Sequence, residues 1–294
     1  MARPSTRGIS CHNRNITNPG FLEKPGFMHM DERILRKALS NIPLGGLRYF
    51  EQTGSTNDVA LAWAAAGAPD LALVFAEQQT AGRGRGNHGW FTAPGAALAF
   101  SLVIRPLPGK EQSASLFSAL GALAVCEVLA AQGLQPEIKW PNDVLLNRRK
   151  VCGILAESVW TGEKLDSLVL GIGLNVKPEA LPPSGQLNFP ATCLEAELLS
   201  PLHVVLAFEQ VLLLQQILQA VRYWRALVPD KIFLHTWERR LAFRGEQVEI
   251  RVDGQAARKG QVDGLEQDGS LRLVSPQGPV FTVQFGEVHL RPVV

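Results

Sequence analysis

The feature that most constrains the fold is a glycine- and arginine-rich segment, Thr80–Gly89. It contains the run from Gly84 to Gly89, a literal match to the G-x-G-x-x-G pattern of dinucleotide-binding folds. In those folds the glycines follow a strand and open a helix, whose N-terminus receives the pyrophosphate. Here Trp90–Gly95 and then the strand-like run Ala97–Ile104 follow instead. The segment therefore disfavours a Rossmann fold and predicts a loop between two buried strands.

The residue types in this loop indicate an anion-binding role. Its glycines permit positive φ and close backbone approach, and Arg83, Arg85 and His88 lie among them. No acidic residue occurs between Thr80 and Trp90, so we expect the loop to repel itself until an anion orders it. A solvated turn between two strands is the alternative reading. Neither a P-loop motif nor the protein-kinase motifs occur in the chain, which removes those two nucleotide-binding classes.

A second basic cluster surrounds one acidic residue. Lys139 and the run Arg148–Lys150 lie on either side of Asp143 in the sequence. The segment Asn147–Arg149 resembles a turn between two short strands. If those strands pair as a hairpin, Asp143 and Lys150 approach each other. A surface salt bridge would explain such a pair equally well, so the pair alone does not indicate catalysis.

The charge balance limits the partners of the chain. It has 294 residues, with 29 Lys and Arg against 27 Asp and Glu, and a formal net charge of +2. Such a balance argues against binding nucleic acid or an anionic membrane over the whole surface. The most apolar stretch, Leu202–Val221, has transmembrane length but contains Glu209 and four Gln. It therefore predicts a core helix, with Ser200 as N-cap and Pro201 at its first position.

The cysteines indicate a compartment rather than a chemistry. Cys11, Cys126, Cys152 and Cys193 lie far apart and lack the spacing of a metal site or a disulfide scaffold. Cys152 has no flanking base, so it is expected to be a buried structural thiol. Reduced thiols of this kind predict a cytoplasmic protein.

The N-terminal region predicts a loose leader. Residues 1–22 carry arginines and no acid, which vaguely resembles a transit peptide, but they lack amphipathic periodicity. Met28 or Met30 could equally be the true start. Residues 30–40 predict a short helix capped by Asp31. About 45 residues of this composition are too few for an independent core, so no N-terminal DNA-binding domain is expected.

Hydrophobic patterning divides the rest of the chain into two parts. Residues 46–242 predict an α+β domain, and residues 243–294 predict a small antiparallel barrel with Asp-Gly and Gln-Gly turns. The strands expected in the first part are Leu47–Gln52, Leu71–Ala76, Ala97–Ile104, Ile138–Trp140, Val144–Leu146, Val151–Val159 and Leu168–Leu174. Besides the apolar core helix, helices are expected at Val59–Ala66, Glu111–Gln132 and Lys231–Leu241. In the second part, strands are expected at Val248–Val252, Leu271–Val274 and Val280–Phe285.

Five segments in order carry a resemblance to a known family. They are Gly54–Asn57, Gln78–Gly86 with Trp90, Lys139–Asp143, Lys150–Leu155 and Gly171–Val176. Together they resemble the biotin protein ligases, over residues 46–294. The resemblance implies a class II synthetase-like α+β domain with a mixed or antiparallel central sheet and flanking helices, followed by an SH3-like C-terminal barrel. It also implies a two-step reaction, in which biotin and MgATP give biotinoyl-5′-AMP and pyrophosphate, and the biotinoyl group then passes to a lysine of a biotin carboxyl carrier domain.

The same resemblance implies site residues, position by position. For biotin the matching positions are Ser55, Thr56, Asn57, Gln78, Arg83, Gly84, Arg85 and Lys150. For the nucleotide they are Arg83, Arg85, Trp90, Asn142, Asn175 and Arg291. Lys150, Arg85 and Asp143 are the residues implied for catalysis. The resemblance implies no protein-held metal, because Mg²⁺ would enter on the ATP phosphates.

Some features of the family are left open or missing. The helix-turn-helix of bifunctional repressor members is missing, so operator binding is not expected. A homodimer is possible, but no residue pattern decides it. Asn87-His88-Gly89 departs from many members, and no role is assigned to His88. A lipoate–protein ligase, with the same acyl-adenylate chemistry, and a non-catalytic biotin sensor are the alternative functions.

Overall fold

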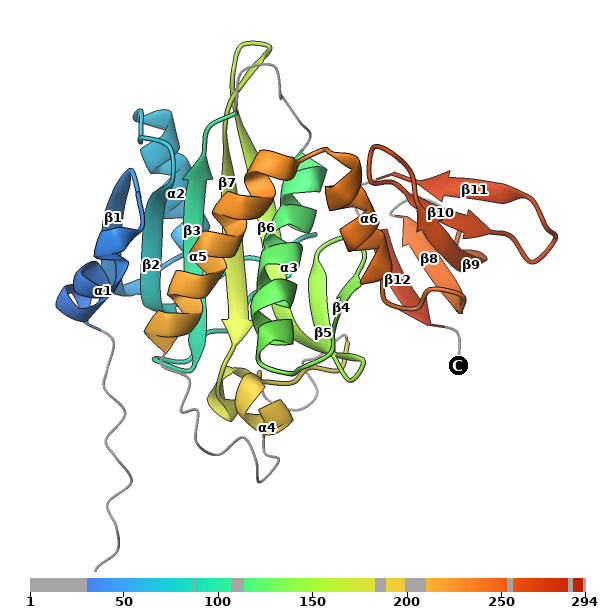
Figure 1. The fold of residues 1–294 in the computed structure, drawn as a ribbon, viewed down its shortest axis with the longest axis horizontal. Coiled ribbons are helices and arrows are strands. Elements are labelled where there is room, and N and C mark those ends of the chain that lie inside the picture. Colours follow the sequence, from blue (N-terminus) through green and yellow to red (C-terminus); the bar gives the residue numbers. More distant parts are fainter. Residues whose placement is uncertain are drawn as a thin grey trace, which may run out of the picture.

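The computed structural model describes residues 31–86, 88–106, 114–182, 189–198, 210–252, 256–284 and 288–292. Its larger part is a seven-stranded sheet in the spatial order β1-β2-β3-β7-β6-β5-β4 (Figure 1). The β1 and β2 strands are parallel, and all other neighbours are antiparallel. The strands are β1 (Gly46–Thr53), β2 (Ala72–Gln79), β3 (Ala97–Ile104), β4 (Pro136–Lys139), β5 (Asp143–Leu146), β6 (Arg149–Thr161) and β7 (Lys164–Asn175). This sheet confirms the predicted mixed α+β architecture.

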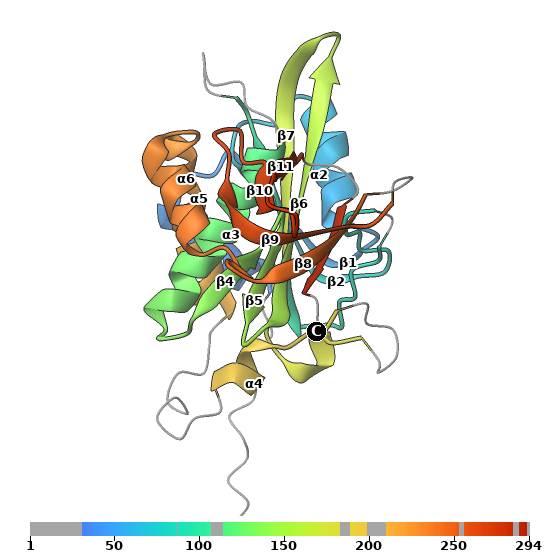
Figure 2. The ribbon, with the colours of Figure 1, turned by 90° about the vertical axis from the view of Figure 1, so that its right-hand side faces the viewer.

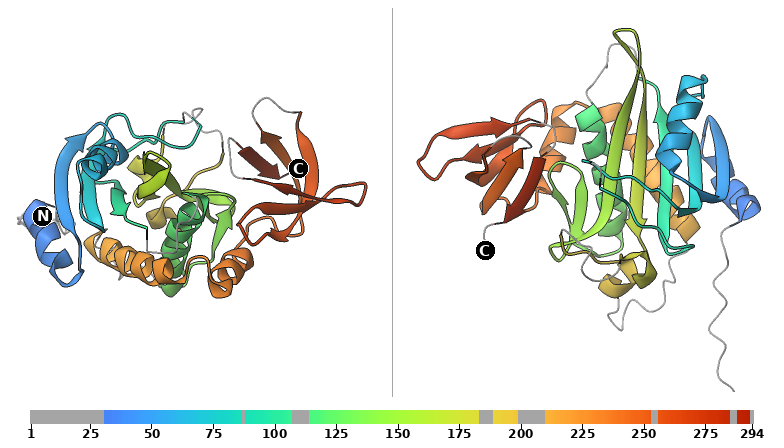
Figure 3. Two further views of the ribbon diagram at one scale, coloured as in Figure 1. Left: turned by 90° about the horizontal axis from the view of Figure 1, so that it is seen from above. Right: turned by 180° about the vertical axis from the view of Figure 1, so that it is seen from behind.

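Helices cover both faces of the sheet. On one face α3 (Ala114–Ala131) packs on β6 and on α5 (Gln210–Leu227), and on the other α2 (Thr56–Ala65) packs on β2, β3 and β7 (Figure 3). Since both faces are covered, all eight residues of β3 are buried. The remaining helices are α1 (Glu32–Ala38), α4 (Leu194–Leu198) and α6 (Lys231–Arg239), with short 3₁₀ turns at Leu39–Asn41 and Pro178–Ala180.

Two helix starts follow directly from capping side chains. Asp31 Oδ1 accepts a hydrogen bond from Ile34 N at 2.7 Å, as the sequence predicts for α1. Ser55 caps α2, so this helix begins at Thr56, three residues before the predicted start. The earlier start places Ser55, Thr56 and Asn57 together at the helix N-terminus, where all three are buried.

The C-terminal part is a five-stranded antiparallel sheet in the order β11-β10-β9-β8-β12 (Figure 2). Its strands are β8 (Gln247–Val252), β9 (Arg258–Leu265), β10 (Leu271–Val274), β11 (Val280–Val283) and β12 (Val288–Pro292). Among these described strands β11 and β12 are edges, so the expected closed SH3-like barrel is not confirmed. The turns at Gly269 and Gly278 occur as predicted, with φ of 83° and 106°.

Sequence patterning misses two strands of this sheet. In β9 charged residues and glycines interrupt the alternation, and β12 ends in Pro292, which an edge strand tolerates. The sheet packs beside α6 and the β4–β5 hairpin, where Trp140 Nε1 donates to Gly269 O at 3.0 Å. Leu290 and Arg291 of β12 line a pocket together with residues of the larger domain.

Several sequence predictions fall outside the described residues. They concern Cys11, residues 1–22, Met28, Met30, Ser200, Pro201, the first turns of the Leu202–Val221 helix and the turn at Asp253-Gly254. No helix in the described part of the chain is long and apolar enough to cross a membrane. Cys126, Cys152 and Cys193 are buried and unpaired. Burial raises the pKa of Cys152 well above its ordinary value, which agrees with a structural thiol.

Candidate active site

Two adjoining pockets lie on the α2 face of the sheet, where the chain between β2 and β3 crosses β7 and β6 (Figure 3, right). The larger pocket encloses about 600 Å³ between this loop, the β4–β5 turn, Lys150 and the C-terminal Arg291. The smaller pocket lies between the loop, the N-terminus of α2 and the middle of β6 and β7. The glycine- and arginine-rich loop is therefore a wall of both pockets.

Glycines of β6 and β7 form the floor of the smaller pocket. A Cβ at Gly173 would overlap the indole of Trp90, and a Cβ at Gly171 would overlap Asn57 Oδ1. Because Gly171 and Gly173 have no side chain, Asn57 and Trp90 can pack directly against the backbone of the sheet. The Trp90 Nε1 atom is buried and has no hydrogen-bond acceptor among the described residues. A ligand oxygen in the pocket would meet an unused donor at this point.

The two pockets share five lining residues, Gly84, Arg85, Trp90, Asn142 and Lys150. Two of them, Arg85 and Lys150, are cations. The Lys150 Nζ atom lies 5.7 Å from the centre of the Trp90 ring. Positive charge is therefore concentrated at the junction, where a group in one pocket would meet a group in the other.

The β5–β6 hairpin places a carboxylate beside this junction. Asp143 Oδ1 lies 2.6 Å from Lys150 Nζ, and Asp143 Oδ2 lies 3.5 Å from Lys139 Nζ. The predicted approach of Asp143 and Lys150 is confirmed. The Asp143 and Lys150 side chains are 13% and 29% exposed, so the pair is more enclosed than an ordinary surface salt bridge.

Burial and charge act in opposite directions on this cluster. Burial raises the pKa of Asp143, but Lys150 and Lys139 outweigh it and hold the pKa below its usual value. Burial is the main cause that lowers the pKa of Lys139, against the opposing effect of Asp143. Asp143 is therefore ionised at neutral pH and is a weak base.

Replacing Lys150 by Met should raise the pKa of Asp143, because the cation that lowers it most is removed while burial remains. In the wild type, the lowered pKa adds stability that is present above pH ~4 and lost as pH falls through the folded-state pKa. We expect the difference in unfolding free energy between wild type and variant to be larger at pH 7 than at pH 3.5. Carboxyl NMR titration and urea unfolding measure the two effects. An unchanged Asp143 pKa in the variant would contradict the assignment.

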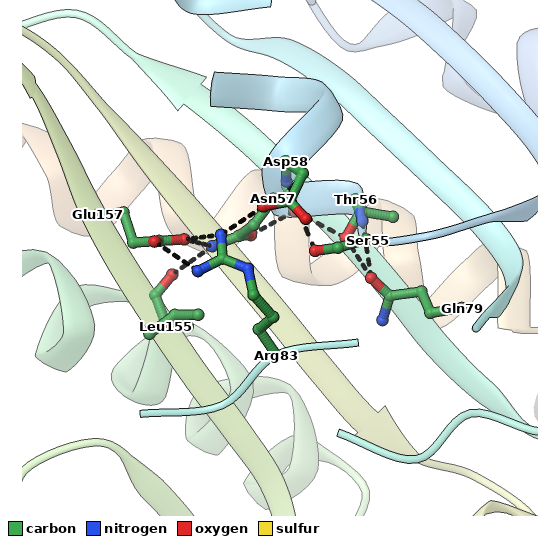
Figure 4. Close-up of polar contacts among 9 residues, drawn as sticks. Ser55, Thr56, Asn57, Asp58, Gln79, Arg83, Leu155 and Glu157 are labelled. Atoms are coloured by element: carbon green, nitrogen blue, oxygen red, sulfur yellow. Dashed lines mark hydrogen bonds and ion pairs between the residues drawn. The ribbon is translucent and has the colours of Figure 1, made fainter. Parts of the chain in front are cut away.

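The residues predicted at the N-terminus of α2 all line the smaller pocket. Thr56 N and Oγ1 donate to Gln79 Oε1 at 2.7 and 3.1 Å (Figure 4). Asn57 Nδ2 donates to Glu157 Oε2 at 2.7 Å and to Leu155 O at 3.3 Å. Ser55 lies beside them and is 2% exposed. The segment therefore forms one rigid wall of the pocket.

Gln78, which the sequence predicts as a biotin contact, is not among the residues that line the two pockets. Gln78 accepts a hydrogen bond from Gln52 at 2.8 Å. Its neighbour Gln79 lines the smaller pocket and holds Thr56. Successive side chains of a strand point to opposite faces, so a shift of one residue decides which glutamine faces the site.

The two arginines of the loop have different surroundings. Arg83 forms a fork with Glu157, with Nη1–Oε1 and Nη2–Oε2 distances of 2.8 Å, and its Nη2 lies 2.7 Å from Asp58 Oδ1. The prediction that the loop repels itself is wrong for Arg83, since acids from α2 and β6 neutralise it. Arg83 lines only the smaller pocket, whereas Arg85 lines both.

Five of the six predicted nucleotide residues line the larger pocket, and the sixth, Arg83, lines only the smaller one. Asn175 and Arg291 line it, and Asn142 and Trp90 line both pockets. Asn142 Nδ2 donates to Ile154 O at 2.6 Å, and Asn175 Nδ2 donates to Thr192 O at 3.0 Å. A backbone carbonyl thus orients each amide through one N–H, and the side-chain oxygen and the second N–H are the groups that a ligand could use.

Sequence reasoning missed several residues of the site. They are Gln79, Ser101 and Glu157, together with Gly153, Gly171 and Gly173 as a floor. The Gly-Ile-Gly run at 171–173 carries a usable signal. In a strand that is buried on both faces, Ile172 packs in the core while its glycine neighbours face the opposite side.

Comparison with known proteins places this geometry in a family. Residues 49–175 match the model of the Biotin/lipoate A/B protein ligase family. The biotin–(acetyl-CoA-carboxylase) ligase of Paracoccus denitrificans is 35% identical over 258 residues, which cover 80% of this chain and 98% of that protein. The chain belongs to the biotin–(acetyl-CoA-carboxylase) ligase family.

Two further similarities are partial or concern the fold alone. The bifunctional ligase/repressor BirA of Bacillus spizizenii is 37% identical over 161 residues, or 54% of this chain, so the match spans only 49% of that relative. The biotin protein ligase of Aquifex aeolicus, solved in complex with biotin and ATP, superposes with a TM-score of 0.71 at 24% identity. That alignment covers 84% of this chain and 99% of the Aquifex chain, and it supports the fold described above.

Proposed function

We propose that this chain activates biotin with ATP and transfers it to a lysine of a biotin carboxyl carrier protein. The observation that carries the proposal is the junction of the two pockets, where Arg85 and Lys150 line both. An acyl-adenylate enzyme needs two anions, a carboxylate and an α-phosphate, to meet in one aligned, positively charged place. Relatives that carry this activity in their names match the chain over most of its length.

The smaller pocket suits the fused rings of biotin and the larger suits the nucleotide. We assign biotin contacts to Ser55, Thr56, Gln79, Gly84, Arg85 and Lys150, with Asn57 and Arg83 as the supporting wall. Nucleotide contacts are assigned to Arg85, Trp90, Asn142, Asn175 and Arg291. We also propose residues 46–242 as the catalytic unit and residues 243–294 as a C-terminal unit that supplies Arg291.

In the first step, a biotin carboxylate oxygen attacks the α-phosphorus, and the bond to the β-phosphate oxygen breaks. Biotinoyl-5′-AMP forms and pyrophosphate leaves, so no protein nucleophile is needed. Lys150 and Arg85 reduce the repulsion between the two anions and stabilise charge that grows on the phosphate. The loop over the smaller pocket excludes water from the mixed anhydride.

In the second step, a neutral carrier lysine amine attacks the acyl carbon, and AMP leaves with the electron pair of the broken C–O bond. Asp143 is beside the junction and is ionised at neutral pH. As a carboxylate with a lowered pKa it is a poor base but a good partner for an amine. We therefore assign it the orientation of the incoming lysine and stabilisation of the ammonium that forms, whose proton passes to the departing AMP phosphate or to water as the amide is made.

Mg²⁺ would be carried by the ATP phosphates. Among the described residues no group of three or more His, Cys, Asp and Glu side chains could hold a metal ion. The charged residues that line the larger pocket are mainly cations (Arg85, Lys139, Lys150 and Arg291), and its carboxylate Asp143 is paired with lysines. When bound, the ion would neutralise charge on the triphosphate.

An avidin blot of a purified carrier domain tests the proposed function. We expect a biotinylated carrier only when enzyme, biotin and ATP are all present, with release of AMP and pyrophosphate. Pyrophosphate exchange that lipoate supports and biotin does not would identify a lipoate–protein ligase instead. Tight biotin binding without exchange or transfer would identify a biotin sensor.

A further inference from the structure

One carboxylate beside the smaller pocket holds two separate walls of it together. Glu157, on β6, accepts the fork from Arg83 of the loop and a hydrogen bond from Asn57 of α2 (Figure 4). Its side chain is 25% exposed. No sequence motif singles out Glu157, and it lines neither pocket. It therefore acts on the site only through the residues that it binds.

The positive charge of Arg83 is neutralised by ion pairs within the protein. One guanidinium faces two carboxylates, Glu157 and Asp58, at 2.7–2.8 Å. Hydrogen bonding to Glu157 is the main cause that raises the pKa of Arg83 above its usual value. Such fork-shaped pairs fix the orientation of a side chain as well as its charge. Arg83 does not line the larger pocket, whereas Arg85, two residues later, does.

The amide of Asn57 is also fully used. Its two N–H groups point to Glu157 Oε2 and Leu155 O, and its Oδ1 accepts from the buried Ser101 hydroxyl at 2.6 Å. Ser101 Oγ lies 2.8 Å from Thr56 Oγ1, which contacts Gln79. A continuous polar chain thus runs from the loop, through Glu157, to the glutamine that faces the pocket.

We infer that Glu157 is a positioning residue for the smaller pocket, and that the two arginines of the loop, Arg83 and Arg85, have separate tasks. Arg83 is the anchor that fastens the loop to Glu157 and Asp58, and Arg85 supplies charge to the reacting groups. This inference rests on the proposed function for its kinetic consequences only, since the anchoring itself is a property of the free protein. Loss of the anchor would loosen the wall around biotin without removing a cation from the junction.

Limited trypsin digestion of the ligand-free protein tests the anchor without any assay of activity. The loop carries two trypsin sites, after Arg83 and after Arg85. We expect Glu157→Gln to speed cleavage in this loop several-fold, because the neutral amide cannot hold the guanidinium fork. Glu163→Gln, an exposed change at the tip of the same β6–β7 hairpin, is the matched control and should leave the rate unchanged. Equal loop cleavage in the Glu157→Gln protein and the wild type would overturn the inference.

A double-mutant cycle tests the division of tasks. In pyrophosphate exchange, Glu157→Gln should raise the KM for biotin about tenfold and change the KM for ATP and kcat less than twofold. Adding Arg83→Ala should have little further effect, since both changes break the same contact. Adding Arg85→Ala should instead lower kcat. The loss of kcat/KM for biotin in this double variant should then equal the product of the losses in the two single variants.

The outcomes separate this inference from the proposed function. If the wild type shows no biotin-dependent exchange, the proposed function fails, while the trypsin result still decides the anchor. If the wild type is active but Arg83→Ala and Glu157→Gln multiply, or if Glu157→Gln lowers kcat alone, then Glu157 does not act through Arg83. Thermal unfolding of each variant identifies a general loss of folding. Such a loss would reduce the amount of active enzyme and so the apparent kcat, and it would not change the KM for biotin alone.

Discussion

Replacing Lys150 by Met should slow biotin-dependent pyrophosphate exchange on the order of 10²–10³-fold, the usual cost of removing one charge aimed at a transition state. Lys150 lines both pockets and lies next to Asp143 and Trp90. Methionine keeps most of the length of the side chain and its contact with the indole. The loss should therefore be in kcat rather than in the KM for biotin, because the cation acts where charge develops.

The matched control is Lys259→Met, on an exposed position of β9 that lines neither pocket. It should keep wild-type exchange and wild-type carrier labelling in the avidin blot. Asp143 keeps Lys139 as a partner in the Lys150 variant, so the fold should persist, and circular dichroism can verify this. Full carrier labelling by the Lys150→Met enzyme would refute the assignment of Lys150 to catalysis.

The fold was predictable where apolar runs are long and bounded by turn residues. Ala97–Ile104 matches β3 residue for residue, since a strand covered on both faces is a nearly continuous apolar run, here interrupted by Ser101 alone. In the C-terminal sheet the opposite holds. In β9, charged residues and glycines interrupt the alternation of apolar and polar residues, and the pairing of this strand with β8 and β10 depends on its neighbours in the sheet.

The site was predictable where a motif marks it, and less so where geometry does. Lys150, Asp143 and Arg85 meet as expected because they lie on one hairpin and one loop. The choice between Gln78 and Gln79 depends on strand register, and one sequence does not fix it. Glu157 was missed because its partners lie 74 and 100 residues away, as Arg83 and Asn57.

Replacing Gly171 by Ala should destabilise the protein by about 1–3 kcal/mol and weaken biotin binding on the order of 100-fold. A Cβ at this position would overlap Asn57 Oδ1, and Asn57 cannot move aside freely. Its amide is held by Ser101, Leu155 and Glu157. Because Asn57 is part of the pocket wall, the same displacement costs both folding and binding. Urea unfolding and isothermal titration with biotin measure the two losses.

Gly54→Ala is the control, since a Cβ there meets nothing within 4 Å. It should change the unfolding free energy by less than about 0.5 kcal/mol. The double variant Gly171→Ala with Asn57→Ala then separates steric overlap from any effect of alanine on the strand. If overlap is the cause, the double variant should lose less stability than the sum of the two single variants, because removing the amide makes room for the new methyl group. It should still bind biotin weakly, since the wall that Asn57 builds between Ser101 and Glu157 is gone. Additive losses of stability would mean that the strand, and not the contact with Asn57, requires glycine at this position.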